Sequence, residues 1–78
     1  MRKFTELETV ILKHDIKEQG LLAGDMGAVV HVYGKGEAAE VEFVTATGRT
    51  IALVMLKLAD VRSALNKDVL HIRNFASA

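Results

Sequence analysis

The 78 residues of this chain, half of them apolar, limit it to one small domain with a thin and mainly aliphatic core. Ten basic residues balance ten acidic ones, which argues against non-specific nucleic-acid binding, and the absence of cysteine excludes disulfides, thiolate metal ligands and cysteine nucleophiles. The longest apolar run, residues 51–56, is far short of the roughly 20 residues of a membrane-spanning helix, so we expect a cytoplasmic protein without membrane contact.

The first half of the chain predicts strands that are separated by glycine-containing turns. Residues 8–16 are β-branched and roughly alternating, which is typical of a strand, whereas residues 17–27 predict a loop with two leucines tucked beneath it. Residues 28–33 predict the next strand. It ends in the turn Gly-Lys-Gly-Glu at 34–37, which needs a positive φ that glycine accepts at little cost.

Residues 39–44 carry the clearest period of two in the chain. Val41 and Phe43 alternate with Glu40 and Glu42, which predicts a strand with its apolar side chains directed inward and its carboxylates outward.

The second half predicts further short elements. Residues 45–49 form a turn in which Gly48 is available for a positive φ, and residues 50–58 are apolar on both faces, as in a central strand that is covered on both sides. Residues 59–66 predict a short helical turn. Residues 67–75 predict a last strand or a short helix.

Short strands with glycine turns and no long helix favour an all-β fold, and a small, highly curved barrel in particular. We expect residues 1–62 to form this barrel of about five strands. Residues 63–78 are expected to form a C-terminal extension that packs on it as a strand or short helix.

Residues 21–34 set an aspartate between two glycines directly before a β-branched run. A phosphate-binding loop would need the glycines to lead into a helix N-terminus, so this pattern favours a strand-entry turn in which Asp25 accepts hydrogen bonds from nearby backbone N–H groups. The predicted turn-forming positions of the chain are Gly24, Asp25, Gly27 and Gly48.

No catalytic or metal-binding constellation is visible. His14, His31 and His71 lie on predicted strands without the spacing of a metal-ligand pair. Glu40 and Glu42 fit the solvated face of a strand better than an acid–base pair. We therefore predict no enzyme, no cofactor and no metal.

Residues 20–62 carry a dense series of motifs. These are Gly-Leu, Gly-Asp-x-Gly-x-Val-Val, a Tyr-x-x-Gly turn, Glu-Val-Glu-Phe, a Gly-x-Thr turn and an Ala-Leu-Val-x-Leu strand. In these motifs the chain resembles the DUF4926 family of small bacterial proteins. The resemblance implies an SH3-like barrel, and it brings no established activity and no catalytic residues. The residues after Arg62 extend beyond the shared pattern.

The apolar residues exceed the needs of one small core. In residues 50–58, Ile51, Leu53 and Met55 project one way, and the second set, which includes Ala52, Val54 and Leu56, should meet the C-terminal tail, another subunit or a partner protein. The residues predicted to contact a partner, from this strand, the loop at 17–26 and its rim, are Leu21, Leu22, Tyr33, Ala52, Val54 and Leu56.

The favoured function is therefore a non-catalytic protein-binding module. It would be a small accessory or regulatory subunit, with a co-encoded enzyme or toxin, or a second copy in a homodimer, as its partner. The main alternative is a nucleic-acid-binding barrel, because residues 23–33 are similar to KOW-type modules and Lys35, Arg49 and Lys57 lie near turns with Tyr33. A subunit of nitrile-hydratase type is a third candidate, on fold analogy alone.

Overall fold

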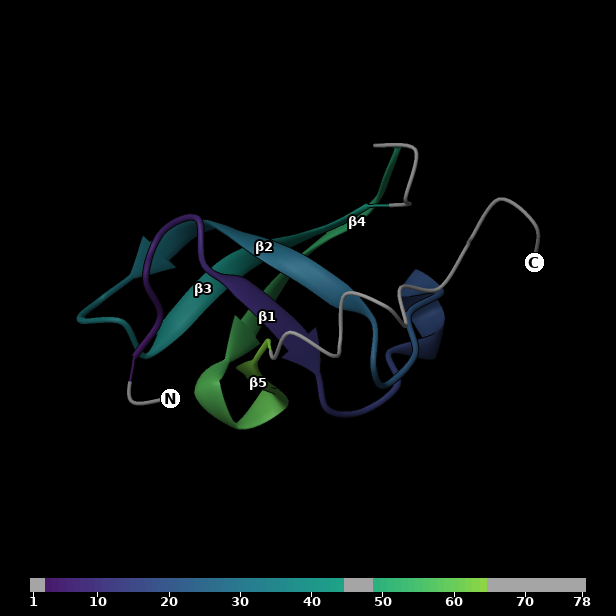
Figure 1. The fold of residues 1–78 in the computed structure, drawn as a ribbon, viewed down its shortest axis with the longest axis horizontal. Coiled ribbons are helices and arrows are strands. Elements are labelled where there is room, and N and C mark those ends of the chain that lie inside the picture. The colour runs from purple at the N-terminus through teal and green to yellow at the C-terminus, as the bar shows by residue number, and fades with distance from the viewer. Residues whose placement is uncertain (1–2, 45–48, 65–78) are drawn as a thin grey trace.

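The computed structural model describes residues 3–44 and 49–64, which form five strands and two short 3-10 helices (Figure 1). The prediction of an all-β domain of about five strands is confirmed. The elements in chain order are β1 (Thr9–Leu12), η1 (Lys17–Gln19), β2 (Met26–Tyr33), β3 (Ala38–Val44), β4 (Thr50–Lys57), η2 (Leu58–Asp60) and β5 (Val61–Ser63).

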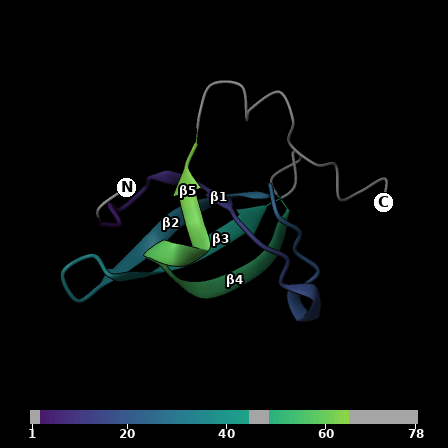
Figure 2. The same ribbon diagram turned by 90° about the horizontal axis from the view of Figure 1, so that it is seen from below.

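All strand pairs are antiparallel, and the order across the sheet is β4-β3-β2-β1-β5. Strands β4 and β5 thus lie at opposite edges, although only the three residues of η2 separate them along the chain. In a flat sheet these edges would be about 19 Å apart, whereas three connecting residues span at most about 14 Å. The sheet therefore curls into a small, incompletely closed SH3-like barrel, and Figure 2 shows β4 continuing through η2 into β5 beside β1.

Two β-bulges contribute to this curvature. The pairing of β2 with β3 shifts between Val29 and His31, which leaves Val30 as the extra residue. The pairing of β3 with β4 shifts at the start of β4, where Ile51 is extra. A bulge bends its strand and increases the local twist, so both bulges help strands β2, β3 and β4 to wrap around the core.

The core lies on the inner face of the curved sheet, where the pairing register brings apolar residues side by side. Val29, Val41 and Val54 share one row, and Gly27, Phe43 and Ala52 share the next one. The alternation predicted for β3 is confirmed, because Val41 and Phe43 are fully buried and the intervening glutamates are partly exposed. The other buried apolar residues are Phe4, Val10, Ile11, Leu12, Leu21, Ala39, Leu56 and Val61.

The N-terminal segment closes one end of this core. The Phe4 N–H donates to the Gly36 carbonyl in the β2–β3 turn (2.8 Å), and the Phe4 ring is only 3% exposed. The predicted turn is confirmed here, since both of its glycines, Gly34 and Gly36, have positive φ.

Strand β4 differs from its prediction as a central strand. It pairs with β3 alone among the described elements and lies at the edge of the sheet. Its outward side chains, Leu53 and Met55, are 52% and 65% exposed. The apolar character on both faces of β4 therefore does not mark a covered strand, because the described part of the domain leaves one of these faces in solvent.

Two further expectations were wrong in detail, and a third is not tested. The first strand is shorter than residues 8–16, because the chain leaves the sheet after Leu12, so that His14 lies in a loop. Residues 59–66 are not one helical turn, since η2 ends at Asp60 and β5 follows. The predicted strand or helix at 67–75, and with it most of the C-terminal extension, lies outside the described residues.

Candidate protein-binding face

On β2, β3 and β4, the residues that alternate with the core residues point to the outer face of the sheet, and the same pairing register aligns them in rows. One row across the three strands contains Ala28, Glu42 and Leu53, and the next contains His31, Glu40 and Met55. A third row contains Tyr33, Ala38 and Lys57. We use the name outer face for the residues Val30, His31, Tyr33, Glu40, Glu42, Leu53 and Met55.

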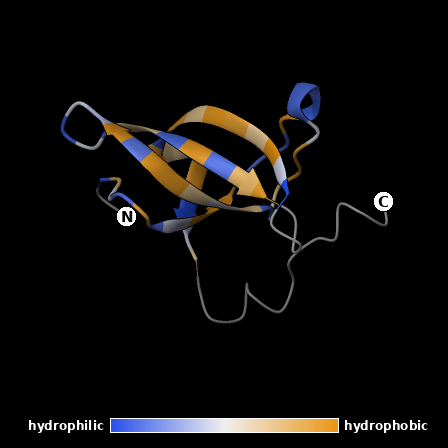
Figure 3. Cartoon of the chain, turned by 90° about the horizontal axis from the view of Figure 1, so that it is seen from above, coloured by the Kyte–Doolittle hydropathy of each residue, from blue (hydrophilic) through white to orange (hydrophobic). Residues whose placement is uncertain are grey.

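Large apolar side chains gather on this outer face. Of the six that are exposed in the described parts of the chain, Val30, Tyr33, Leu53 and Met55 lie on it, with exposed fractions from 39% to 65%. Isolated exposed apolar residues are common on protein surfaces, whereas a group of them on neighbouring strands makes this face a candidate contact surface. The hydropathy colouring in Figure 3 shows the largely apolar band of β4 running along the margin of the sheet.

Polar groups border this apolar strip. The carboxylates of Glu40 and Glu42 lie on β3 next to Met55 and Leu53, and the Thr50 hydroxyl donates to Glu42 Oε2 (3.4 Å). On β2, the rings of His31 and Tyr33 make an edge-to-face contact with centroids 4.5 Å apart. The outer placement predicted for His31 is confirmed. The outer face thus combines exposed aliphatic residues with carboxylates and an aromatic pair.

The residues predicted as partner contacts divide into two groups. Leu22 and Tyr33 are exposed at 40% and 39%. Leu21, Ala52 and Leu56 are buried in the core, and Val54 packs against it. The predicted outward orientation of the β4 set was therefore wrong, because a strand pattern with apolar residues at every position does not reveal which of its two faces is covered.

The turn before β2 contains the predicted aspartate in its predicted role. Asp25 is 3% exposed, and its Oδ2 accepts a hydrogen bond from the Leu22 N–H (2.9 Å). Gly24 has a φ of +96°, which a residue with a side chain adopts only at a cost. This strand-entry turn is confirmed, and the residues that follow it form a strand and not the helix that a phosphate-binding loop requires.

The two other predicted turn glycines have different outcomes. Gly27 lies within β2, where a Cβ atom would come within 2.6 Å of Val41 Cγ1 and 2.9 Å of Phe43 Cε1. It is therefore needed for close packing against the core and not for a turn. Gly48 lies outside the described residues.

A strained turn lies at the N-terminal approach to the sheet. Leu7 has a φ of +68° and is 83% exposed, and no other non-glycine residue in the described ranges has a positive φ. The Glu8 N–H donates to the Thr5 carbonyl (3.1 Å), and the Leu7 N–H donates to the Val29 carbonyl beside the β2 bulge (2.8 Å). This conformation is unfavourable for leucine because its Cβ atom crowds the backbone at a positive φ, and because its apolar side chain is left in water.

A histidine–aspartate pair joins the loop after β1 to η2. His14 Nε2 is 2.9 Å from Asp60 Oδ1, and His14 Nδ1 is 3.1 Å from the Asp15 carbonyl oxygen. The hydrogen bond to Asp60, followed by the one to Asp15, raises the pKa of His14 above its ordinary 6.5. Burial alone would raise the pKa of Asp60, but the hydrogen bonds from His14 and the Lys57 N–H outweigh it and lower that pKa.

The basic residues of the nucleic-acid alternative are not brought together. Lys35 lies in the β2–β3 turn, and Lys57 at the end of β4 pairs with Ala38, so these two share one end of the sheet with Tyr33. Arg49 precedes β4 at the other end, eight residues before Lys57, which corresponds to about 26 Å along an extended strand. Within the described ranges, no three histidine, aspartate or glutamate side chains cluster as metal ligands.

Sequence reasoning missed two features of the structure, one on the outer face and one at the N-terminal approach to the sheet. Leu53 and Met55 were assigned to the wrong face. The alternation in β3 could have indicated the correct one, because Glu42 and Glu40 pair with these two residues and cross-strand partners share a face. The strain at Leu7 has no sequence signal, since leucine does not favour a positive φ.

Fold and surface together define a small, curved all-β domain with an apolar strip on its outer face. The chain belongs to the family described as "Domain of unknown function (DUF4926)", whose model matches residues 6–63. The resemblance over residues 20–62 is thereby confirmed, and the family pattern also includes β1 and the loop after it. No curated protein and no solved structure matches the chain. None of the helices among the described residues is long and apolar enough to cross a membrane.

Proposed function

We propose that this protein is a non-catalytic protein-binding domain, a small accessory or regulatory subunit, and that its outer face is the contact surface. The observation that carries the proposal is the pair Leu53 and Met55, which project from an edge strand with more than half of each side chain in solvent. Burying these two side chains in a complex contributes about 1–2 kcal/mol each, at roughly 25 cal/mol per Å² of apolar area.

The surroundings of the pair support the same function. Tyr33 and Val30 extend the apolar surface across β2, and the two glutamates of β3 separate it into a strip on each side. A contact surface of this kind combines apolar residues with charged groups that select the partner and the orientation of binding.

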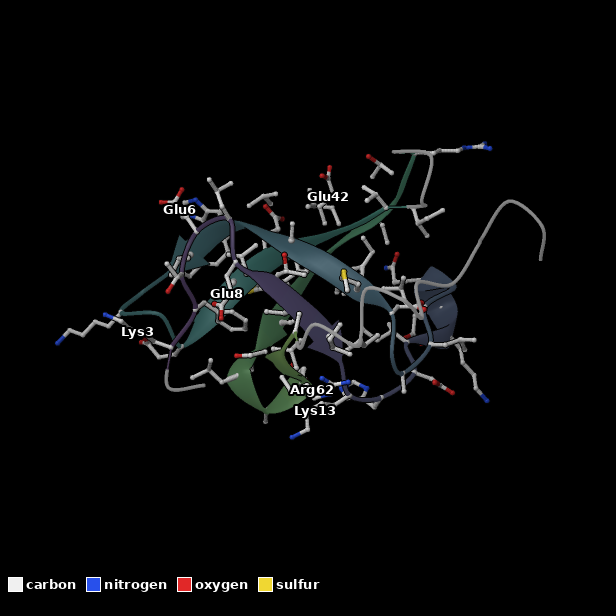
Figure 4. The ribbon with its side chains drawn as sticks, viewed as in Figure 1. Lys3, Glu6, Glu8, Lys13, Glu42 and Arg62 are labelled. Carbon is white, nitrogen blue, oxygen red and sulfur yellow. The ribbon has the colours of Figure 1, made fainter. Side chains whose placement is uncertain are left out.

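Photochemical crosslinking of the full chain in cells tests the proposal. A benzophenone amino acid at Met55 should give a covalent adduct with a protein of defined mass, whereas the same group at Lys13 should not. Figure 4 shows Lys13 and Glu42, which neighbours Leu53, at opposite margins of the molecule. If position 55 gives no protein adduct, or if positions 55 and 13 give the same adducts, the outer face is not the contact surface.

A further inference from the structure

We propose that a second copy of this chain pairs with the β4 edge of the outer face, and that the two β4 strands run antiparallel with Leu53 of each copy opposite Met55 of the other. The inference rests on the proposed function, since it names the occupant of the same surface. It follows from three properties of β4, namely its free edge, the direction of its backbone groups and its register.

The edge of β4 lacks the features that usually prevent strands of different molecules from pairing. Proteins protect long edge strands with proline, charged residues or bulges. This chain has no proline, and β4 has no charged residue before its last position, Lys57. The bulge at Ile51 lies near the start of the strand, so residues 52–57 are regular. The described part of the chain places nothing in pairing position along this edge.

The backbone groups of Leu53 and Met55 point toward the free edge. The Lys57 N–H donates to Asp60 Oδ2 (2.7 Å), so it does not donate across the sheet to β3. Neighbouring residues in an antiparallel pair alternate between positions that bond the partner strand and positions that face away from it. Met55 and Leu53, two and four residues before Lys57, therefore share its outward backbone direction. Their N–H and C=O groups are available to a second strand, while their side chains are exposed on the outer face.

Three two-fold registers pair these outward-facing residues, and the charges select one of them. Pairing Leu53 with Leu53 of the second copy sets Lys57 opposite Arg49, which brings like charges together. Pairing Met55 with Met55 sets Leu53 opposite Lys57. The pairing of Leu53 with Met55 places apolar residues opposite each other in both central pairs, sets Lys57 opposite Ile51 at the periphery, and brings no like charges together.

The selected register is closed and symmetric. Each central pair exchanges two backbone hydrogen bonds, so the two pairs supply about four. Because the two contacts are related by a two-fold axis at Val54, the interface is satisfied by two chains and does not propagate into a fibre. On the outer face, two leucines and two methionines form one apolar cluster. Glu42 and Glu40 of each copy border it.

Sedimentation velocity of the full chain over a concentration series is the experiment. The unmodified chain should sediment with the mass of a dimer, and the Leu53→Lys/Met55→Lys variant as a monomer with an unchanged circular-dichroism spectrum, since both side chains are exposed. The Leu53→Glu/Met55→Lys variant should dimerise again and dissociate as salt is added, because only this register sets the introduced acid opposite the introduced base. Leu7→Lys, which charges an exposed leucine in the turn before β1, is the matched control and should remain dimeric.

Register-specific disulfide formation provides a second readout that does not depend on the charged variants folding. The chain has no cysteine, so a Leu53→Cys chain mixed with a Met55→Cys chain reports only the engineered contact. Across a hydrogen-bonded pair the Cα atoms are about 5.5 Å apart, within the range of a disulfide. Two Leu53→Cys chains would place theirs about 8–9 Å apart, beyond that range. The mixed product should therefore dominate under mild oxidation.

The possible results separate the two proposals. A chain that stays monomeric, while position 55 crosslinks to a different protein, overturns the self-pairing and leaves the protein-binding function intact. A monomeric chain without any adduct overturns both. A dimer that persists in the double-lysine variant, or that forms the symmetric disulfides as readily as the mixed one, shows association by another surface or register and overturns the inference.

Discussion

His14 Nε2 lies 2.9 Å from Asp60 Oδ1, although the two residues are 46 positions apart in the chain. This contact joins the loop after β1 to η2, which connects the edge strands β4 and β5. The same carboxylate accepts the Lys57 N–H through Oδ2 (2.7 Å), and the Asp60 carbonyl accepts the Lys13 N–H (2.8 Å). One residue of η2 thereby fixes the end of β4 and the approach of β5 to β1, where the curled sheet comes closest to closing.

The His14–Asp60 contact makes stability depend on pH in a defined direction. Both ring nitrogens of His14 face oxygen acceptors, so the protonated ring fits the contact, and its pKa is raised. The stabilisation from His14 is complete below the ordinary pKa of 6.5 and is lost as pH rises through the raised folded value. The contribution of Asp60, whose pKa is lowered, is complete above 3.8 and lost as pH falls through its lower folded value. The pair therefore stabilises most between about pH 4 and 6.5.

Urea denaturation of the unmodified chain and of His14→Ala at pH 5.5 and pH 8.5 measures this effect. The variant should be less stable at pH 5.5, and the difference should shrink at pH 8.5. In Asp60→Asn, an NMR titration should show the His14 pKa moving back toward 6.5. A difference between the two chains that is the same at both pH values would mean that His14 acts through packing and not through its charge.

Leu7→Gly should stabilise the domain. A positive φ costs a residue with a side chain roughly 1–2 kcal/mol, whereas the greater freedom of glycine in the unfolded chain costs about 0.5–1 kcal/mol. We expect a net gain of about 0.5–1 kcal/mol in the free energy of unfolding, measured by urea denaturation. Glu6→Gly, at the neighbouring turn position without a positive φ, is the control and should lose stability. Equal losses in both variants would mean that Leu7 is not strained.

Gly27→Ala should destabilise the domain by about 1–3 kcal/mol, the usual cost of overpacking a core. The added methyl group would meet Val41 and Phe43, which are both fully buried, at distances that force these side chains to shift. Because Val41 Cγ1 is the nearest atom, Val41→Ala in the same chain should recover part of this loss, so that the double variant is more stable than the sum of the single effects predicts. Additive effects in thermal denaturation would contradict the contact.

Asp25→Ala should cost more stability than Asp15→Ala, although both carboxylates accept backbone N–H groups in the same loop. Asp25 Oδ2 bonds the Leu22 N–H in a buried position, and Asp15 Oδ1 bonds the Ala23 N–H (2.8 Å) at the surface. Water replaces the lost acceptor only at the exposed site. We expect a loss of about 1–3 kcal/mol for Asp25→Ala and less than 1 kcal/mol for Asp15→Ala. Asp25→Asn, which retains an acceptor oxygen, should lie between them, and equal losses would contradict this role of burial.

The amino-acid sequence by itself determined the features that depend on neighbouring residues. The alternation at Val41 and Phe43 predicted which face of β3 is buried, because successive side chains of a strand point to opposite faces. The glycines at 24, 34 and 36 predicted turns, since a positive φ is a local requirement, and the Leu22 N–H that Asp25 accepts lies only three residues before it.

The tertiary structure alone decided the features that depend on long-range pairing. Residues 50–57 are apolar at nearly every position, so their sequence does not distinguish a central strand from an edge strand. The pairing of β4 with β3 alone places it at the edge and exposes Leu53 and Met55. The contact between His14 and Asp60 likewise exists only because the sheet curls and returns β5 to β1, and no local pattern in the chain encodes that closure.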